Sequence, residues 1–379
     1  MATTSIGDRV RASIPTQLSQ RRLAPEVGMT HDALSRAING QRHFSAIELA
    51  KLAELLDVDT HWLITGDQDP FKVRLAARHP WGQSSAEQEE SDGAIIARVL
   101  DAYRAAYAQG GRMPTSMNPL PTDPTQLRRL LWTAGQDAGV RDLAEQVENV
   151  LGVDIVRDPG LQTDYSFRIG DHAVVLLKST VYWFRANWSI AHELGHLALG
   201  HHVHGRTTPA DEAPADAFAG EFLLPEDMVS DADWGTMTAE QLALWLWNAG
   251  VSTVALGRRL SALGISPSDE VRVALKDSTP KLMRTYVDLI SANVQTSGDS
   301  IWERENATTG RQFPERLVVA LTDRVEAGQA DPYLLAWVRE VPVDDLSWPE
   351  PDLEAASPDH IDLESRSSEI DWFSLLEAQ

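Results

Sequence analysis

The chain contains no cysteine, so it can form no disulfide bond and offers no thiolate ligand to a metal. Any zinc site in it must therefore be built from histidine and carboxylate side chains. It also lacks an apolar run long enough to span a membrane. No basic stretch followed by an apolar one suggests a signal peptide. We therefore expect a cytoplasmic protein.

Positive charge is in deficit, since 33 lysines and arginines stand against 56 acidic residues and the net charge is −23. This balance argues against a protein that coats nucleic acid generally. The acids are unevenly spread, because residues 341–379 carry 11 acids and one arginine, a net of −10. We expect residues 350–379 to form an acidic tail. Residues 1–45 carry six arginines and three acids, a net of +3, so the excess of negative charge does not extend to the start of the chain.

One five-residue stretch, His192-Glu193-Leu194-Gly195-His196, predicts metal-assisted hydrolysis. Positions i and i+4 of a helix share one face, so His192 and His196 can bind the same Zn²⁺. Glu193 then lies beside the metal, where it suits a general base acting on water. The flanking residues are apolar and predict a buried helix, in which such polar groups need a metal or a partner. Histidine and carboxylate ligands suit zinc and also tolerate Mn²⁺.

A catalytic zinc site uses three protein ligands, and two positions compete for the third. His202 has the spacing of the extended H-E-x-x-H-x-x-G-x-x-H pattern, but Leu199 occupies the place of its glycine. Glu212 opens a second predicted helix, whose first turn could lie against the metal helix. We favour Glu212, and we interpret His201, His202 and His204 as part of a solvated loop.

Three segments together resemble the ImmA/IrrE family of metallopeptidases: residues 188–197, the run Glu212-x-x-Ala215-Asp216-x-Phe218-Ala219, and Leu223-Leu224-Pro225. The resemblance covers roughly residues 139–265. It implies a zincin-like domain, Glu212 as the third metal ligand, Glu193 as the catalytic base, and limited cleavage of a repressor protein. Metal-bound histidines usually donate their other N–H to a carboxylate, and Asp216, one turn after Glu212, is the candidate for that role.

Residues 5–66 show the pattern of a helix-turn-helix. Residues 19–26 predict a helix, Gly28 a turn, and Thr30 the N-cap of a second helix that runs to about Asn39. The pattern resembles the five-helix DNA-binding module of the Cro/phage-repressor (XRE) class. A helical bundle used for protein contact is the alternative.

The resemblance places one face of the second helix in the major groove and assigns its neighbours to the phosphates. Because the charge of +3 is weak for DNA binding at physiological salt, we expect two copies, a homodimer, on operator DNA. Besides Thr30, the candidate base contacts are His31, Asp32, Ser35 and Arg36, and the candidate phosphate contacts are Gln20, Asn39 and Arg42.

We expect a mostly α protein with a small β-sheet, of class α+β. Short strands are predicted at 154–156, 166–168 and 173–177, and helices at 94–108, 143–152, 238–247, 252–263 and within 311–338. The expected domains are 1–78 (helix-turn-helix), 79–124 (linker with one helix, its segment 81–93 polar), 125–265 (metallopeptidase), 266–349 (C-terminal helical region) and 350–379 (acidic tail).

The leading hypothesis is a DNA-binding zinc endopeptidase that regulates transcription by cleaving a repressor. In it, Tyr182, Arg185 and His204 are candidates to stabilise the oxyanion. The alternative is a helix-turn-helix regulator, of a phage-immunity or antitoxin-like kind, whose metallopeptidase fold serves as a sensor or dimerisation scaffold. A hydrolase of small peptides or amides is a third, weaker reading.

Overall fold

The structure, a computed structural model, is mostly helical, and its described part holds one four-stranded sheet, so the α+β expectation is confirmed. No helix among the described residues is long and apolar enough to cross a membrane. The predicted acidic tail, 350–379, lies outside the described residues. The structure describes residues 5–56, 58–67, 69, 71–77, 86–108, 113–132, 143–204, 208–297 and 300–346.

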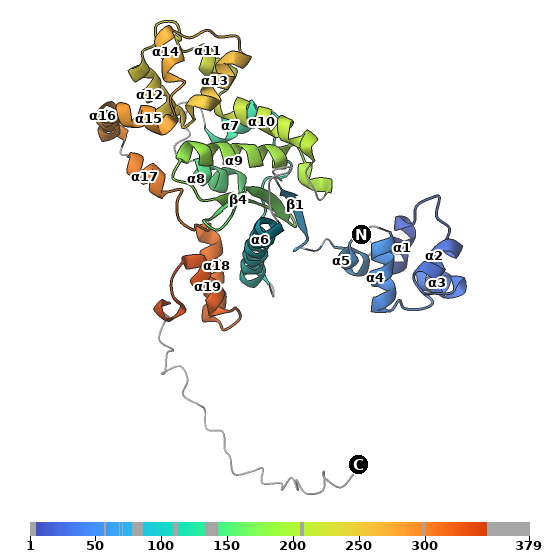
Figure 1. Cartoon of the computed structure of the whole chain (residues 1–379). Helices are drawn as coiled ribbons and strands as arrows, with labels where there is room; N and C mark the ends of the chain where they lie inside the picture. Colours follow the sequence, from blue (N-terminus) through green and yellow to red (C-terminus); the bar gives the residue numbers. More distant parts are fainter. Residues whose placement is uncertain are drawn as a thin grey trace, which may run out of the picture.

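Five helices at the start of the chain gather into a separate body, seen in blue in Figure 1. The side chain of Thr30 accepts a hydrogen bond from the backbone amide of Ala33 and so caps the second helix of the predicted pair. Gly28 forms the turn with a φ of +77°, which favours glycine. Ala24 and Leu34 are fully buried where the two helices meet. The helices are α1 (Ile6–Ser13), α2 (Gln20–Glu26), α3 (His31–Ile38), α4 (Ala46–Leu55) and α5 (Thr60–Thr65).

The sheet has the strand order β1-β3-β4-β2, in which only β2 and β4 run parallel. The three predicted strands are confirmed. A fourth was not expected, because Val73–Ala77 had been placed at the end of the first domain and instead pairs with β3, Val73 opposite Ile169. That pairing joins residues far apart in sequence, so no local pattern predicts it. The strands are β1 (Val73–Ala77), β2 (Asp154–Asp158), β3 (Tyr165–Ile169) and β4 (His172–Lys178).

Helix α6 (Ala86–Tyr107) begins earlier than predicted, within the segment that we had interpreted as a polar linker. Residues 86–90 read Ala-Glu-Gln-Glu-Glu, all strong helix formers, and their polarity does not prevent a helix that has an exposed side. The helix packs with α18 (Glu315–Glu326) and α19 (Pro332–Arg339) on one face of the sheet, around a shared core. The predicted helical pair within 311–338 is thereby confirmed as α18 and α19.

The opposite face of the sheet carries the helices that hold the motif (Figure 1). The predicted helix at 143–152 is confirmed as α8 followed by a π-helical turn, and it ends at Gly152 with a φ of +66°. These elements are α7 (Pro124–Leu131), α8 (Leu143–Gln146), the π-helical turn Val147–Leu151, α9 (Trp183–Ala198), the 3₁₀ turn His201–His204 and α10 (Pro209–Leu223).

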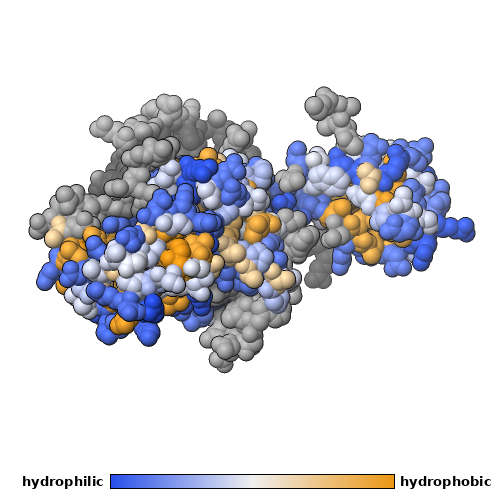
Figure 2. Space-filling view, turned by 90° about the horizontal axis from the view of Figure 1, so that it is seen from above, coloured by the Kyte–Doolittle hydropathy of each residue, from blue (hydrophilic) through white to orange (hydrophobic). Residues whose placement is uncertain are grey.

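The remaining helices pack onto the same core as α9. The two helices predicted at 238–247 and 252–263 are confirmed as α12 and α13, capped by Thr238 and Ser252. From above, the surface is mostly hydrophilic with scattered hydrophobic patches (Figure 2). The elements are α11 (Glu226–Ser230), α12 (Ala239–Ala249), α13 (Thr253–Ala262), α14 (Asp269–Ala274), α15 (Thr279–Thr285), α16 (Val287–Ser297) and α17 (Ile301–Asn306). The 3₁₀ turn Val343–Asp345 packs instead on the core that α6, α18 and α19 share.

A buried ionic network fastens the sheet to the helices α6 and α18. The Oδ2 atom of Asp154 accepts a 2.6 Å hydrogen bond from the Tyr103 hydroxyl and lies 2.8 Å from Nε2 of His172. Its Oδ1 atom accepts a 2.6 Å hydrogen bond from Nε of Arg316. Burial alone raises the pKa of Asp154, but His172 and then Arg316 together hold that pKa below its usual value.

We predict that Asp154→Asn lowers the free energy of unfolding at pH 7 by about 2–3 kcal/mol, because Arg316 loses its counter-charge and the buried side chains of Tyr103 and His172 lose their charged hydrogen-bond acceptor. A lowered pKa contributes stability above the ordinary value, about 4, and that contribution is lost as pH falls through the folded value. Urea unfolding should therefore show a smaller difference between wild type and variant at acidic pH. Asp101→Asn, which removes an exposed pair with Arg104, is the control and should change little. An equal loss in both variants would contradict the prediction.

Candidate metal centre

The site forms where α9 and α10 approach each other closely. Gly195 makes this approach possible, because a Cβ atom there would lie 3.2 Å from both the backbone oxygen of Ala215 and Cβ of Phe218. Such distances are tighter than ordinary van der Waals contact, so a larger residue would push the helices apart. The first turn of α10 is thereby held against the middle of α9.

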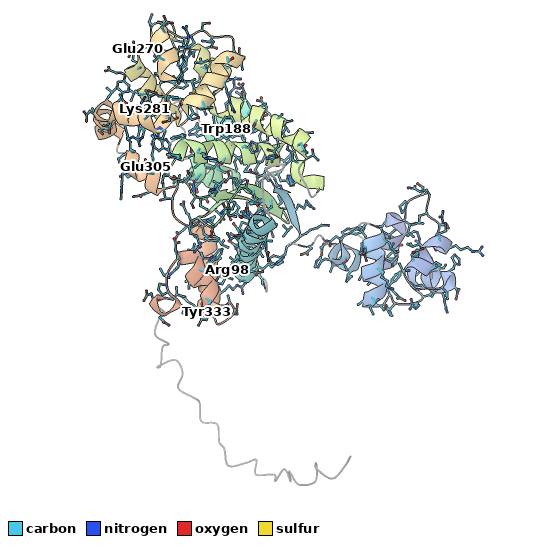
Figure 3. The ribbon with its side chains drawn as sticks, viewed as in Figure 1. Arg98, Trp188, Glu270, Lys281, Glu305 and Tyr333 are labelled. Carbon is cyan, nitrogen blue, oxygen red and sulfur yellow. The ribbon has the colours of Figure 1, made fainter. Side chains whose placement is uncertain are left out.

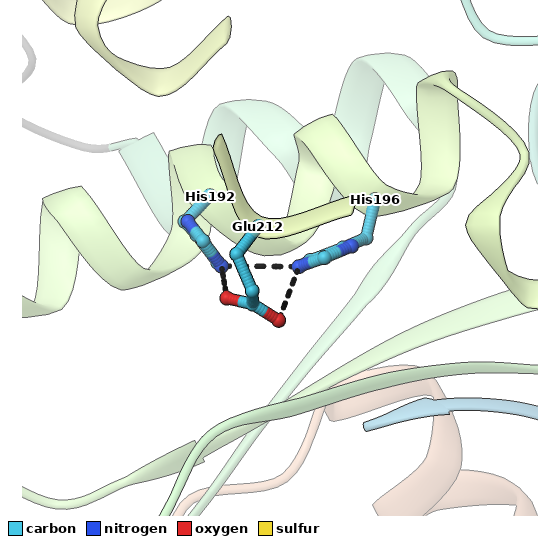
Figure 4. A group of neighbouring side chains, drawn as sticks. All are labelled: His192, His196 and Glu212. Atoms are coloured by element: carbon cyan, nitrogen blue, oxygen red, sulfur yellow. Dashed lines mark hydrogen bonds and ion pairs between the residues drawn. The ribbon is translucent and has the colours of Figure 1, made fainter. Parts of the chain in front are cut away.

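His192, His196 and Glu212 converge in one place (Figure 4). The Nε2 atoms of the two histidines lie 3.0 Å apart. The carboxylate oxygens of Glu212 lie 3.4 Å from Nε2 of His192 and 3.8 Å from Nε2 of His196. Both histidines are buried, whereas the Glu212 side chain is 23% exposed. The geometry therefore brings together the three residues that the sequence singled out.

Hydrogen bonds to the far side of each ring orient the two imidazoles. Nδ1 of His192 lies 2.9 Å from Oδ1 of Asp216, where the sequence had placed a carboxylate partner. Nδ1 of His196 lies 2.8 Å from Nδ1 of His201, whose own Nε2 is 3.6 Å from Asp211. If both histidines donate through Nδ1, each turns the lone pair of Nε2 toward Glu212.

These donors fit a zinc ion. Two nitrogen lone pairs facing each other across 3.0 Å repel unless a cation lies between them. Tetrahedral zinc with bonds of about 2.0–2.1 Å holds its ligand atoms about 3.3 Å apart, close to the three separations observed. The set of two imidazoles and one carboxylate leaves a fourth position for water or substrate.

The electrostatics keep His196 neutral. Burial lowers the pKa of His196 to about 4, and the proximity of His192 adds to that effect. A neutral imidazole has the free lone pair that a metal requires, so this histidine is prepared for coordination at neutral pH.

Glu193 lies on the same helix, fully buried beside the cluster, and neither of its carboxylate oxygens has a hydrogen-bond partner among the described residues. Burial raises the pKa of Glu193 to about 7, although His192 and the hydroxyl of Ser166 on β3 oppose the rise. Ser166 lies near enough to act on that pKa, but no hydrogen bond of normal geometry joins it to the carboxylate. A carboxyl group that exchanges its proton near neutral pH suits acid–base chemistry.

The sequence misjudged the histidines that follow the motif. We had interpreted them as a solvated loop, but the His201 side chain is 12% exposed and His202 is 6% exposed. His202, the rival third ligand, does not join the cluster. His201, whose contact with His196 went unpredicted, is the functional candidate that was missed. The only available signal was its position directly after Gly200, which has a φ of +75° and turns the chain back.

Two of the three oxyanion candidates lie away from the cluster of His192, His196 and Glu212. Tyr182 and Arg185 line a separate hollow with residues of α13 and α15. The side chain of His204 lies outside the described residues.

The predicted recognition helix, α3, presents its candidate base contacts to solvent. His31, Asp32 and Arg36 are exposed, and Ser35 is partly exposed. Arg36 pairs with Asp32 at 3.0 Å, an exposed pair of small energetic value that a phosphate or base can displace.

Two of the three candidate phosphate contacts, Arg42 and Asn39, are already engaged within the protein. Arg42 pairs with Glu48 at 2.8 Å, and Oδ1 of Asn39 accepts a 2.7 Å hydrogen bond from Arg11. Gln20 is half-buried at the start of α2. Arg42 and Asn39 would have to share or exchange these partners to contact DNA.

Comparisons with known proteins identify two regions. Residues 148–261 match the sequence model of a peptidase family described as the IrrE N-terminal-like domain, and residues 17–63 match a helix-turn-helix model. No curated protein and no solved structure matches the chain. The two matches confirm the resemblance to ImmA/IrrE proteins with an N-terminal helix-turn-helix.

We predict that Gly195→Val weakens zinc binding by about tenfold or more, because the added methyl groups push α10 away and Glu212 moves with it. Zinc affinity can be measured by competition with a chelating dye. The matched control is Gly220→Val on α10, where an added Cβ meets nothing within 4 Å. Equal zinc affinity in the two variants would show that the close approach at Gly195 does not position Glu212.

Proposed function

We propose that this protein is a DNA-binding, zinc-dependent endopeptidase, since residues 148–261 match the IrrE N-terminal-like domain and residues 17–63 match a helix-turn-helix. We further propose that it regulates transcription by limited cleavage of a repressor. The observation that carries the proposal is the cluster of His192, His196 and Glu212 beside the buried, unpartnered carboxyl group of Glu193.

The protein's own residues have distinct roles in this proposal. His192, His196 and Glu212 would hold the metal, and Asp216 and His201 would keep the two imidazoles in the required tautomer. When bound, zinc supplies an electrophile that polarises a peptide carbonyl and lowers the pKa of water toward about 7. Glu193 would take a proton from the attacking water and return it to the leaving amine nitrogen.

The burial of Glu193 supports both halves of that proton transfer. A carboxyl group with an ordinary pKa accepts a proton poorly at neutral pH, whereas one with a pKa of about 7 both accepts and donates. The absence of hydrogen-bond partners leaves its two oxygens open to water and to the leaving group.

The helix-turn-helix supports a role in transcription. The exposed face of α3 carries donors and acceptors of the kind that read base edges in the major groove. The family resemblance implies a repressor as substrate. Two copies on DNA remain our proposal, because a single body with a charge of +3 binds DNA weakly.

We predict that Glu193→Gln abolishes cleavage while zinc stays bound, since the amide cannot accept the proton. Glu212→Ala should lose the zinc, about one ion per chain by elemental mass spectrometry, whereas Glu226→Ala, an exposed control on α11, should keep it. Cells that carry the wild type or Glu193→Gln are then compared for new protein N-termini. New termini in a DNA-binding repressor should appear with the wild type alone.

The same comparison distinguishes the alternative. Identical sets of N-termini, with the biological effect retained by Glu193→Gln, would overturn the peptidase proposal. Such a result would favour a helix-turn-helix regulator whose metallopeptidase fold serves as a sensor or scaffold.

We predict that Arg36→Ala weakens specific DNA binding by about tenfold, the cost of one lost side-chain contact to a base. The operator can first be selected from random sequences, and affinity then measured by fluorescence anisotropy at fixed salt. Arg129→Ala, which removes an exposed arginine from α7, is the charge-matched control. Unchanged affinity in Arg36→Ala would remove α3 as the recognition helix.

A further inference from the structure

A hollow of about 670 Å³ lies between the first turns of α9 and the starts of α13 and α15. It is separate from the cluster of His192, His196 and Glu212. Three arginines converge on it, Arg185 from α9, Arg258 from α13 and Arg284 from α15. Among the described residues that line it, there is no aspartate and no glutamate.

This concentration of positive charge is unusual for the chain, whose net charge is −23. Several arginines elsewhere have acidic partners, such as Arg311 with Asp158 and Arg42 with Glu48. No hydrogen bond or ion pair from the side chain of Arg185, Arg258 or Arg284 to another described residue is found. Three unpaired guanidinium groups around one hollow repel one another, and an anion placed among them would relieve that repulsion.

The start of α13 adds a further attraction for an anion. This helix has ten residues, and the first amides of a helix carry the positive end of its dipole. The amide of Ala255 is satisfied by the Ser252 side chain and that of Thr253 by Thr279. The amide of Val254, which lines the hollow, has no such partner among the described residues.

An aromatic wall closes the other side of the hollow. The rings of Tyr182 and Phe184 stack with centroids 5.6 Å apart and an interplanar angle of 27°. Trp188, labelled in Figure 3, lines the hollow together with residues of α13 and α15. Tyr182 is 41% exposed, so part of its ring remains free for stacking with a ligand.

We propose that this hollow binds a nucleotide, with its phosphate among Arg258, Arg284 and the start of α13 and its base against Tyr182 or Trp188. The planar guanidinium matches phosphate in a two-pronged contact, and every nucleobase has a flat face that stacks on aromatic rings. An acidic peptide would use the arginines but leave the aromatic wall without a partner. The nucleotide is either a free one or the end of a nucleic-acid strand.

The position of the hollow connects it to the metal centre. Trp188 precedes His192 by four residues on one face of α9, about 6 Å along the helix axis. A nucleotide there would contact the helix that carries Glu193. The proposal concerns binding alone, so it holds whether or not the protein cleaves a substrate.

Isothermal titration calorimetry on the full zinc-loaded chain tests the proposal with ADP and GDP as probes. We expect binding at sub-millimolar concentration, weakened about tenfold by Arg258→Ala or Arg284→Ala and unchanged by Arg129→Ala. Adenosine or pyrophosphate alone should bind more weakly than either nucleotide. All three arginines are exposed, so the variants should fold, and thermal melting confirms it.

A short single-stranded oligonucleotide distinguishes the two sources. Tighter binding than the mononucleotides, with the same dependence on Arg258, assigns the hollow to a strand end, and equal binding assigns it to free nucleotide. The proposal is overturned if neither nucleotide binds, if binding survives both arginine variants, or if hexaglutamate binds in place of the nucleotides.

Discussion

The close contact between α9 and α10 is the constraint on which the candidate site depends. Three donors must converge on one point, yet the two histidines lie on one helix and the carboxylate on the next. Gly195 removes the side chain that would keep these helices apart, and the backbone of Ala215 occupies the space. The sheet behind α9 and the apolar core around it keep this helix pair rigid.

The same packing explains how an unpartnered carboxyl group is tolerated. Burying Glu193 without a hydrogen bond costs free energy. The packing of the surrounding core offsets this cost, since no described residue hydrogen-bonds to the carboxyl group. This burial raises the pKa of Glu193, because it disfavours the charged form of the carboxyl group. By contrast, Asp154 on strand β2 is equally buried but has hydrogen-bond partners at both carboxylate oxygens, and its pKa is lowered. Two carboxyl groups thus differ in proton affinity because of their neighbours.

The sequence predicted best where one local rule was enough. The spacing of His192 and His196 follows from helix geometry, and Asp216 followed from a general rule about metal-bound histidines. Glu212 was favoured over His202 because Leu199 stands where the extended pattern needs glycine, and the family resemblance pointed to the same residue.

Contacts between residues distant in sequence were beyond such reasoning. Strand β1 is defined by its pairing with β3, Val73 opposite Ile169, and no periodicity in residues 73–77 predicts that pairing. His201 reaches His196 because the chain reverses at Gly200, which a linear pattern of histidines does not show. Arg185, Arg258 and Arg284 likewise come together only in the folded chain.

Because strand β1 belongs to the sheet, the segment before it is a short connection between the helix-turn-helix body and the peptidase-like region. Only seven residues separate the end of α5 from the start of β1, and seven residues span at most about 25 Å. If α3 binds an operator as proposed, the candidate metal centre would be confined to the immediate surroundings of that site. A protein bound next to it on the same DNA would meet the centre at a high effective concentration, whereas one free in solution would not. Under this arrangement, location on the DNA would select the substrate as much as side-chain recognition does.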